Sequence, residues 1–223
     1  MKALGRRLAN QTSSLKLLFS EPALLRKWLA ATRSGYLLDT GWIVSAAQGS
    51  PVDPRGRPLP WLTYPMIEFL NERLSTDMHV FEFGGGNSTL YFAGRVSDVT
   101  TVEHDPKWAA YLRRRVPDNC TLIVTPLAYG GDYSRAAKTA GRRFDIVLVD
   151  GRDRVNCALS SVETLSDRGV IIFDDFERAQ YQSVAERLED GGFRQISFWG
   201  MKPGLIKGSN TALFYRADNV FRL

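Results

Sequence analysis

The chain has 223 residues, of which 44% are hydrophobic and 24% charged, and this predicts a globular protein with one α/β domain and a full core. No apolar run reaches the ~18–20 residues of a membrane span, and we expect no secretory signal. Two cysteines and two histidines offer no disulfide framework and no histidine-based metal site, so we expect reduced thiols and a cytoplasmic location.

The net charge of +5 is concentrated near the N-terminus. Residues 1–35 carry a net charge of +6, and residues 36–223 carry −1. Because the body of the chain is nearly neutral, its overall basicity does not indicate nucleic-acid binding, and we expect no nucleic-acid partner.

The first predicted helix begins at Pro22 and runs through Leu29, with apolar residues among basic ones. One interpretation is a helix packed on the main domain or on a second subunit of a homodimer. The alternative is a helix that lies on a membrane surface. With the turn-rich segment that ends at Pro60, it forms an N-terminal helical extension of residues 1–60, and residues 61–223 form the main domain.

From Trp61 onward, strand and helix signals alternate. Helices are predicted from Pro65 through Leu74, at Asn87–Gly94, from Pro106 through Leu112, at Asn156–Leu165 and at Phe176–Leu188. Strands are predicted at His79–Phe83, Val99–Glu103, Thr121–Thr125, Phe144–Val149, Gly169–Phe173, Phe193–Trp199 and Thr211–Tyr215.

Continuous apolar strands between helices indicate a parallel sheet that is covered on both faces. The last two strands have no helix between them, which predicts an antiparallel hairpin at one edge. The predicted fold is therefore α/β, a doubly wound and mostly parallel seven-stranded sheet with a C-terminal antiparallel β-hairpin, plus the N-terminal helical extension.

A glycine-rich loop follows the first strand. Glycine permits close approach of a ligand to the backbone, so this loop predicts a binding site. The carboxylate of Glu82 would repel a pyrophosphate but would attract the ammonium and sulfonium of S-adenosylmethionine. A threonine also replaces the third glycine of the dinucleotide fingerprint, which favours S-adenosylmethionine over NAD. The loop and the start of the next helix contain Gly84, Gly85, Gly86, Asn87, Ser88 and Thr89.

The second strand ends at Glu103, with His104 beside it and about twenty residues after Gly84. A carboxylate at this position suits hydrogen bonds to two ribose hydroxyls. The alternative is an acid that stabilises the N-terminus of the helix beginning at Pro106.

These motifs resemble class I S-adenosylmethionine-dependent methyltransferases, over about residues 61–216. The resemblance implies a Rossmann-like fold, S-adenosylmethionine as cofactor and methyl transfer as the activity, and it places Tyr64 where such enzymes close over the cofactor. The third strand departs from the pattern, because it lacks the acid that many relatives use on the adenine amine; backbone near Ala128 would take that role. The matching segments are Glu82–Gly86, Glu103, Phe144–Gly151 and Gly169–Asp175.

Three acids follow the fourth and fifth strands: Asp150, Asp174 and Asp175. Carboxylates this close repel one another unless a cation or protons intervene. The pattern is similar to that of magnesium-dependent O-methyltransferases that act on sugars and small phenolics, which makes Mg²⁺ a candidate second cofactor. The alternatives are neutralisation by Arg152 and Arg154, or a helix-capping role for Asp174 or Asp175.

Methyl transfer needs a group that aligns the acceptor and removes its proton. Asp150 or Asp153 is the candidate base, and Arg152 is a candidate for orienting an anionic or hydroxylated acceptor; the alternative is a solvated loop of ion pairs. The predicted function is O-methylation of a small molecule or glycan. The alternatives are an NAD-dependent oxidoreductase and a non-catalytic cofactor-binding scaffold. Residues 36–64 and Gly200–Ser209 contain no motif that identifies the acceptor.

Overall fold

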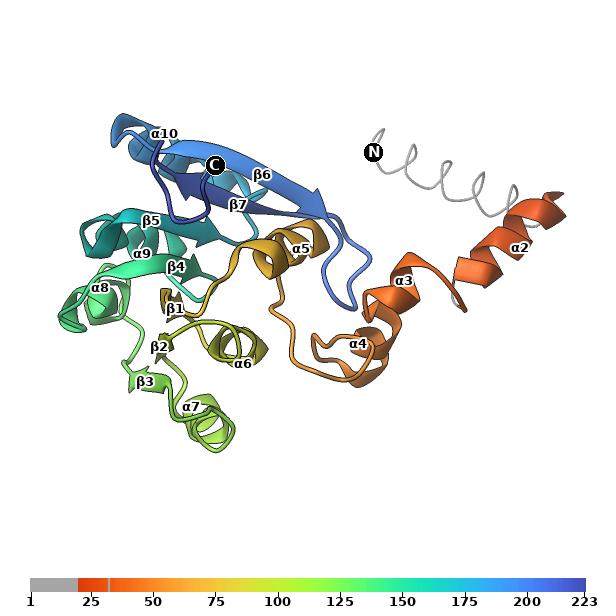
Figure 1. The fold of residues 1–223 in the computed structure, drawn as a ribbon, viewed down its shortest axis with the longest axis horizontal. Helices are drawn as coiled ribbons and strands as arrows, with labels where there is room; N and C mark the ends of the chain where they lie inside the picture. The colour runs from red at the N-terminus through yellow and green to blue at the C-terminus, as the bar shows by residue number, and fades with distance from the viewer. Residues whose placement is uncertain (1–19, 32) are drawn as a thin grey trace, which may run out of the picture.

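The seven strands form one sheet in the order β3-β2-β1-β4-β5-β7-β6. The computed structural model describes residues 20–31 and 33–223, and Figure 1 shows the helices on both sides of this sheet. Strands β1 to β5 are parallel, whereas β7 runs antiparallel to both β5 and β6. The predicted fold class is confirmed. The strands are β1 (His79–Phe83), β2 (Asp98–Glu103), β3 (Cys120–Val124), β4 (Phe144–Val149), β5 (Leu165–Phe173), β6 (Arg194–Gly200) and β7 (Ser209–Tyr215).

The predicted helices are present, but three further helices, α3 (Tyr36–Asp39), α4 (Trp42–Gln48) and α8 (Asp132–Thr139), were not individually predicted, and one predicted helix begins later than expected. Helix α8 had no clear sequence signal, and α10 (Gln182–Asp190) begins six residues later than predicted. Phe176 suggested an earlier start, but it belongs to an irregular segment that packs against Phe173 and Phe214. The other helices are α2 (Pro22–Ala31), α5 (Tyr64–Arg73), α6 (Asn87–Ala93), α7 (Pro106–Arg113) and α9 (Arg154–Ser161), with 3₁₀ turns η1 (Val162–Thr164) and η2 (Ala179–Tyr181).

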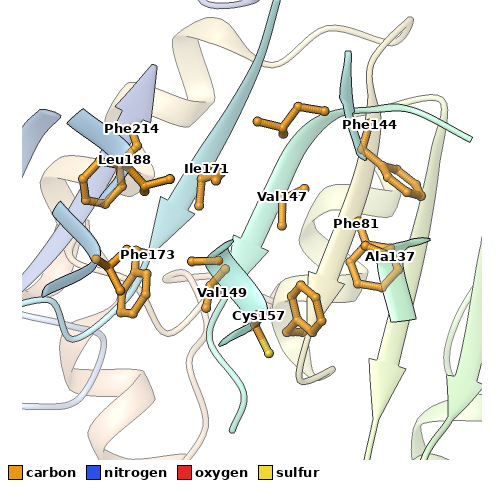
Figure 2. Packing of buried hydrophobic residues seen from close by; sticks show 14 of the residues in the cluster. Phe81, Ala137, Phe144, Val147, Val149, Cys157, Ile171, Phe173, Leu188 and Phe214 are labelled. Atoms are coloured by element: carbon orange, nitrogen blue, oxygen red, sulfur yellow. The ribbon is translucent and has the colours of Figure 1, made fainter. Parts of the chain in front are cut away.

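The sheet separates two hydrophobic cores. Alternate side chains of each strand point to opposite faces, so Phe81 and Val147 join the core under α8, α9 and α10. Figure 2 shows this core, in which Phe81, Phe144 and Phe173 fill the space between strands and helices. Val80 and Leu148 join the opposite core under α5 and α6. Both cores hold the carboxyl ends of the central strands in fixed positions.

Helix α4 and the segment between α4 and α5 are tied to the loop that joins β6 to β7. Trp42 Nε1 donates to the Leu205 carbonyl (3.0 Å), and Trp61 Nε1 donates to the Pro203 carbonyl (2.9 Å). On the other side, Asn87 Nδ2 donates to the Pro51 carbonyl (2.8 Å). These bonds place residues 49–61 over the carboxyl ends of the strands, next to the glycine loop.

The predicted N-terminal helix is present as α2, which projects from the body of the protein in Figure 1. Leu24 and Leu29 on this helix are exposed. Its contact with a second subunit or with a membrane surface stays a prediction, and the basic residues 1–19 lie outside the described residues. Among the residues that the structure describes, no helix has the length and apolar character to span a membrane.

Glu82 is a buried carboxylate that joins three elements near the site. Its side chain has no exposed surface. It accepts hydrogen bonds from Ser88 and Thr89 at the start of α6, and from Thr101 on β2 (2.9 Å). Burial raises the pKa of Glu82 to about 7, although the three hydroxyl donors act in the opposite direction. The carboxyl therefore organises the base of the glycine loop.

Replacement of Glu82 by glutamine tests the raised pKa of this buried carboxyl group. Because the pKa of Glu82 is raised from 4.5 to about 7 in the folded protein, wild type loses stability as the pH rises through this interval, by about 3 kcal/mol in total. We expect the free energy of unfolding of E82Q to increase relative to wild type between about pH 5 and about pH 8. Urea denaturation at both pH values measures this difference, and a difference that does not change with pH would contradict the assignment.

Candidate functional site

A cavity of about 620 Å³ opens at the carboxyl ends of β1, β2 and β4. This is the edge at which open α/β sheets bind their ligands. The cavity lies between the glycine loop and the segment around Pro51. The predicted site residues that line it are Gly84, Gly85, Gly86, Asn87, Ser88, Glu103, His104, Asp150 and Arg152.

Glycine is required at two positions of the loop for packing. Gly84 has a φ of +85°, and a Cβ atom there would lie 2.7 Å from the Cα atom of Gly151. A Cβ atom on Gly85 would lie 2.6 Å from a methyl group of Leu112. At Gly86 the nearest atom to such a Cβ is 4.0 Å away, on Trp108. The first two glycines therefore fit the loop against the protein, and the third leaves open space on the cavity side.

Glu103 is fixed at the cavity wall by backbone donors. Its carboxylate accepts from the amides of Gly85 (3.2 Å), His104 (2.7 Å) and Asp105 (2.9 Å). Each carboxylate oxygen has two lone pairs, so acceptor capacity remains for ligand hydroxyls. Asp105, rather than Glu103, caps α7 by accepting from the amides of Lys107 and Trp108. This geometry fits the ribose-binding role and does not need the helix-stabilising alternative.

Trp108 forms a wall of the cavity that the sequence did not reveal. Its indole Nε1 donates to the Gly85 carbonyl (2.7 Å), and its ring packs on Tyr111 with 5.0 Å between centroids. The side chain is 42% exposed, so it presents an apolar surface beside Glu103. The available signal was an aromatic residue in the first helical turn after the second strand, but such residues are more often part of a core.

Several predicted cofactor residues do not line the cavity. Glu82 and Thr89 lie beneath the loop, where Thr89 donates to Glu82 and accepts from the Gly86 amide (3.0 Å). Tyr64 is buried with its ring edge against Tyr36. Ala128 is exposed and its carbonyl accepts from the Gly131 amide (2.9 Å). None of these four residues lines the cavity, where direct contact with the cofactor was expected. Glu82 and Thr89 support the glycine loop from beneath it.

Asp153 also differs from its prediction as a base. It lies in the left-handed region, at φ 50°. Its two carboxylate oxygens accept from the Gly130 amide (2.7 Å) and from Asn156 Nδ2 (2.8 Å). Because both oxygens are engaged by neutral donors that hold the turn, Asp153 stabilises the loop after β4. Asp150 is therefore the better candidate for proton removal.

The acids after β4 and β5 form one network with three cations, of which Lys202 and Arg154 are largely buried. Lys202 Nζ lies 2.5 Å from oxygens of both Asp174 and Asp175. Arg154 lies 3.0 Å from Asp150 and 3.3 Å from Asp175. Asp175 also pairs with Arg178 (2.5 Å). Three carboxylates are thus balanced by side chains of the same chain.

Burial and neighbouring charges shift the pKa values of these acids in different directions. Burial, assisted by the negative charge of Asp150, raises the pKa of Asp174 well above its ordinary value. Burial also raises the pKa of Asp150, against the opposing charge of Arg154. Burial acts in the same direction on Asp175, but the hydrogen bond and charge of Lys202 outweigh it, so the pKa of Asp175 is lowered. Asp150 and Asp174 therefore hold protons more tightly than free aspartates.

This network does not support the predicted magnesium site at Asp150, Asp174 and Asp175. Lys202 and Arg154 occupy the positions between the carboxylates and use the oxygens that a metal would need. In the described part of the chain, no group of three or more His, Cys, Asp or Glu side chains is arranged to hold a metal ion. Neutralisation by Arg154 was one of the predicted alternatives. Lys202 was missed, because nothing in its local sequence indicates burial.

The strand order, the glycine loop and the acid at the end of β2 are those of an α/β fold of the methyltransferase type. A family model described as "Methyltransferase domain" matches residues 81–176. This match covers the glycine loop and strands β2 to β5 and, with the strand order, supports a class I S-adenosylmethionine-dependent methyltransferase; the NAD-dependent oxidoreductase alternative does not agree with it. No curated protein sequence matches the chain.

Solved structures show the same fold. A precorrin 8w decarboxylase from Methanobacterium thermoautotrophicum has 20% identity and a TM-score of 0.53, over 76% of this chain and 97% of that protein. A methyltransferase-like protein from Silicibacter pomeroyi has 26% identity and a TM-score of 0.50, over 72% and 89%. A precorrin-6y C5,15-methyltransferase from Geobacter metallireducens has 15% identity and a TM-score of 0.53, over 68% and 88%.

The glycine loop gives a direct test of the cofactor site. Alanine at Gly84 would strain the backbone by about 1–3 kcal/mol and would place its Cβ atom against the backbone of Gly151. We expect G84A to bind S-adenosylhomocysteine at least ~10-fold more weakly, which corresponds to about 1.4 kcal/mol. Isothermal titration calorimetry measures this change. Gly208, with no atom within 4 Å of a built Cβ, provides the matched control G208A, and equal affinities of the two variants would contradict the assignment.

Proposed function

We propose that the protein transfers the methyl group of S-adenosylmethionine to a hydroxyl oxygen of a small molecule or glycan. We call the cavity of about 620 Å³ beside the glycine loop the cofactor cavity. Support comes from a second cavity, of about 420 Å³, beside it. Its size falls within the range of small-molecule sites. Trp61, Asp150, Arg154 and Arg178 line both cavities. An acceptor in the second cavity would therefore have its reactive end next to the cofactor.

The position of Asp150 carries this proposal. It lies at the end of β4, where the two cavities meet, and its carboxylate is held by Arg154 Nη2 (3.0 Å). Burial raises the pKa of Asp150, which makes its carboxylate a stronger base than an exposed aspartate. The side chain is thus both oriented and suited to accept a proton from an acceptor hydroxyl.

The cofactor supplies an electrophilic methyl group on sulfur, and the protein must align the acceptor oxygen with it. As the bond between oxygen and the methyl carbon forms, the bond between carbon and sulfur breaks and S-adenosylhomocysteine leaves. Asp150 takes the hydroxyl proton, and Arg154 stabilises the carboxylate before that step. Glu103 and the glycine loop hold the nucleoside end, and Trp61 covers the junction of the two cavities. A non-catalytic cofactor-binding scaffold would not carry out this proton transfer.

Replacement of Asp150 by asparagine separates the enzyme from a scaffold. Removal of a general base lowers the rate by about 10²–10⁴-fold, so we expect turnover of D150N to fall by this factor while S-adenosylhomocysteine affinity stays within about threefold. In wild type, the rate should rise with pH and reach its plateau above the ordinary aspartate range, because the pKa of Asp150 is raised.

Release of S-adenosylhomocysteine from a panel of hydroxylated acceptors measures this turnover. Asp132, an exposed aspartate on α8, provides the matched control D132N. No release by wild type would favour the scaffold, and full activity of D150N would contradict the role of Asp150.

The ion network leads to a prediction on metal dependence. Because Lys202 supplies the positive charge between Asp174 and Asp175, we expect turnover to be unchanged by a chelator. Replacement of Lys202 by methionine should lower the free energy of unfolding by about 3–5 kcal/mol, since it leaves buried carboxylates unpaired. Denaturant unfolding of K202M against K207M, an exposed lysine of the same loop, measures this effect. Loss of activity with chelator and its recovery with Mg²⁺ would contradict the prediction.

A further inference from the structure

A third cavity, of about 370 Å³, lies next to the loop after β4. We propose that it binds an anionic group of the methyl acceptor, a carboxylate or a phosphate, while the acceptor's hydroxyl lies at Asp150. This inference rests on the proposed methyl transfer and names the class of acceptor. The cavity is lined by Arg152, Arg154 and Arg178 together with Tyr129 and Tyr181.

Arg152 is the first reason for an anionic ligand. Its side chain is exposed to both the cofactor cavity and the third cavity. Its backbone amide donates to Tyr133 Oη (3.4 Å), but no carboxylate or carbonyl among the residues described by the structure pairs with its guanidinium. A guanidinium has five donors that match carboxylate and phosphate geometry. This group is therefore available for an anion from outside the chain.

The charge balance of the third cavity supports the same conclusion. Three guanidinium groups line it, and the carboxylate of Asp153 is its acid. Asp153 is buried and already accepts from the Gly130 amide and Asn156. Arg178 uses one nitrogen on Asp175 (2.5 Å) and remains 47% exposed. The acids Asp150, Asp174 and Asp175 line the second cavity instead, so positive and negative charge are separated across Arg154.

This separation of positive and negative charge would orient a bound acceptor. Arg178 lines all three cavities, and Arg154 does the same. An anion beside Arg152 and Arg178 would be repelled by the carboxylates near Asp150, so the uncharged end of the molecule would face Asp150. Tyr129, which is 74% exposed, offers a ring surface at the outer wall of the third cavity. The geometry thus selects an acceptor that carries an anion at one end and a hydroxyl at the other.

The test compares two probes that differ by one charge. Protein saturated with S-adenosylhomocysteine is titrated with 3,4-dihydroxybenzoate and with 3,4-dihydroxybenzyl alcohol in a calorimeter, and inorganic phosphate is added as a competitor. We expect wild type to bind the carboxylate at least ~10-fold more tightly than the alcohol, as a charge-assisted bidentate contact would require. Phosphate should compete with the carboxylate and leave binding of the alcohol unchanged.

The variants R152Q and R178Q should each lose this preference, while R152K keeps part of it because it retains the charge but not the paired donors. The control is R194Q, which removes an exposed arginine on β6. R152Q, R152K and R194Q should retain the wild-type melting temperature, R178Q should remain folded although it loses its pair with Asp175, and all variants should retain S-adenosylhomocysteine affinity.

Three results would overturn the inference. One is equal binding, or no binding, of the two probes by wild type. Another is retention of the preference in both R152Q and R178Q. The third is a tenfold loss of S-adenosylhomocysteine affinity in R152Q, which would assign Arg152 to the carboxylate of the cofactor. Because these measurements need no methyl transfer, failure of the anion site is distinguishable from failure of the proposed function, which the turnover of D150N tests.

Discussion

The site depends on a close backbone contact between the ends of β1 and β4. The Asp150 amide donates to the Phe83 carbonyl (3.3 Å), and glycines at 84 and 151 let the two loops touch. A Cβ atom on Gly151 would lie 2.9 Å from that same carbonyl. Because no side chain separates these loops, the glycine loop and Asp150 are held in one rigid frame. In the proposed reaction, this frame would align the methyl donor with Asp150 without a large rearrangement.

The buried ions explain how this frame tolerates three carboxylates at neighbouring strand ends. Each buried charge carries a desolvation cost that only a well-placed partner offsets. Lys202 reaches Asp174 and Asp175 from the loop between β6 and β7, and Arg154 reaches Asp150 from the start of α9. The same pairing leaves Arg152 without a partner among the described residues, so the positive and negative walls of the site are distinct. The charges that hold the fold therefore also give the acceptor region its polarity.

The strands were predictable because burial on both faces requires continuous apolar runs, and β1 and β4 have the predicted limits. The signal for α8 was weak because this helix packs with small side chains such as Ala136 and Ala137. The glycine loop and Glu103 were also predictable, since each is placed by the end of its own strand. Glu82 was expected to face a ligand, but it lies near the end of β1 and its buried side chain accepts from Ser88 and Thr89 at the start of α6.

The sequence by itself determined the doubly wound fold, the cofactor and the acids at the strand ends, because these follow from local periodicity and from positions along single strands. Only the tertiary structure decided which partner each charge has. Lys202 and Asp174 are 28 residues apart, and Trp61 and Pro203 are 142 apart, so no local pattern connects them. Electrostatic pairing depends on distance in space and on burial. That is why the sequence suggested a metal between the acids, whereas the folded chain places its own ammonium and guanidinium groups there.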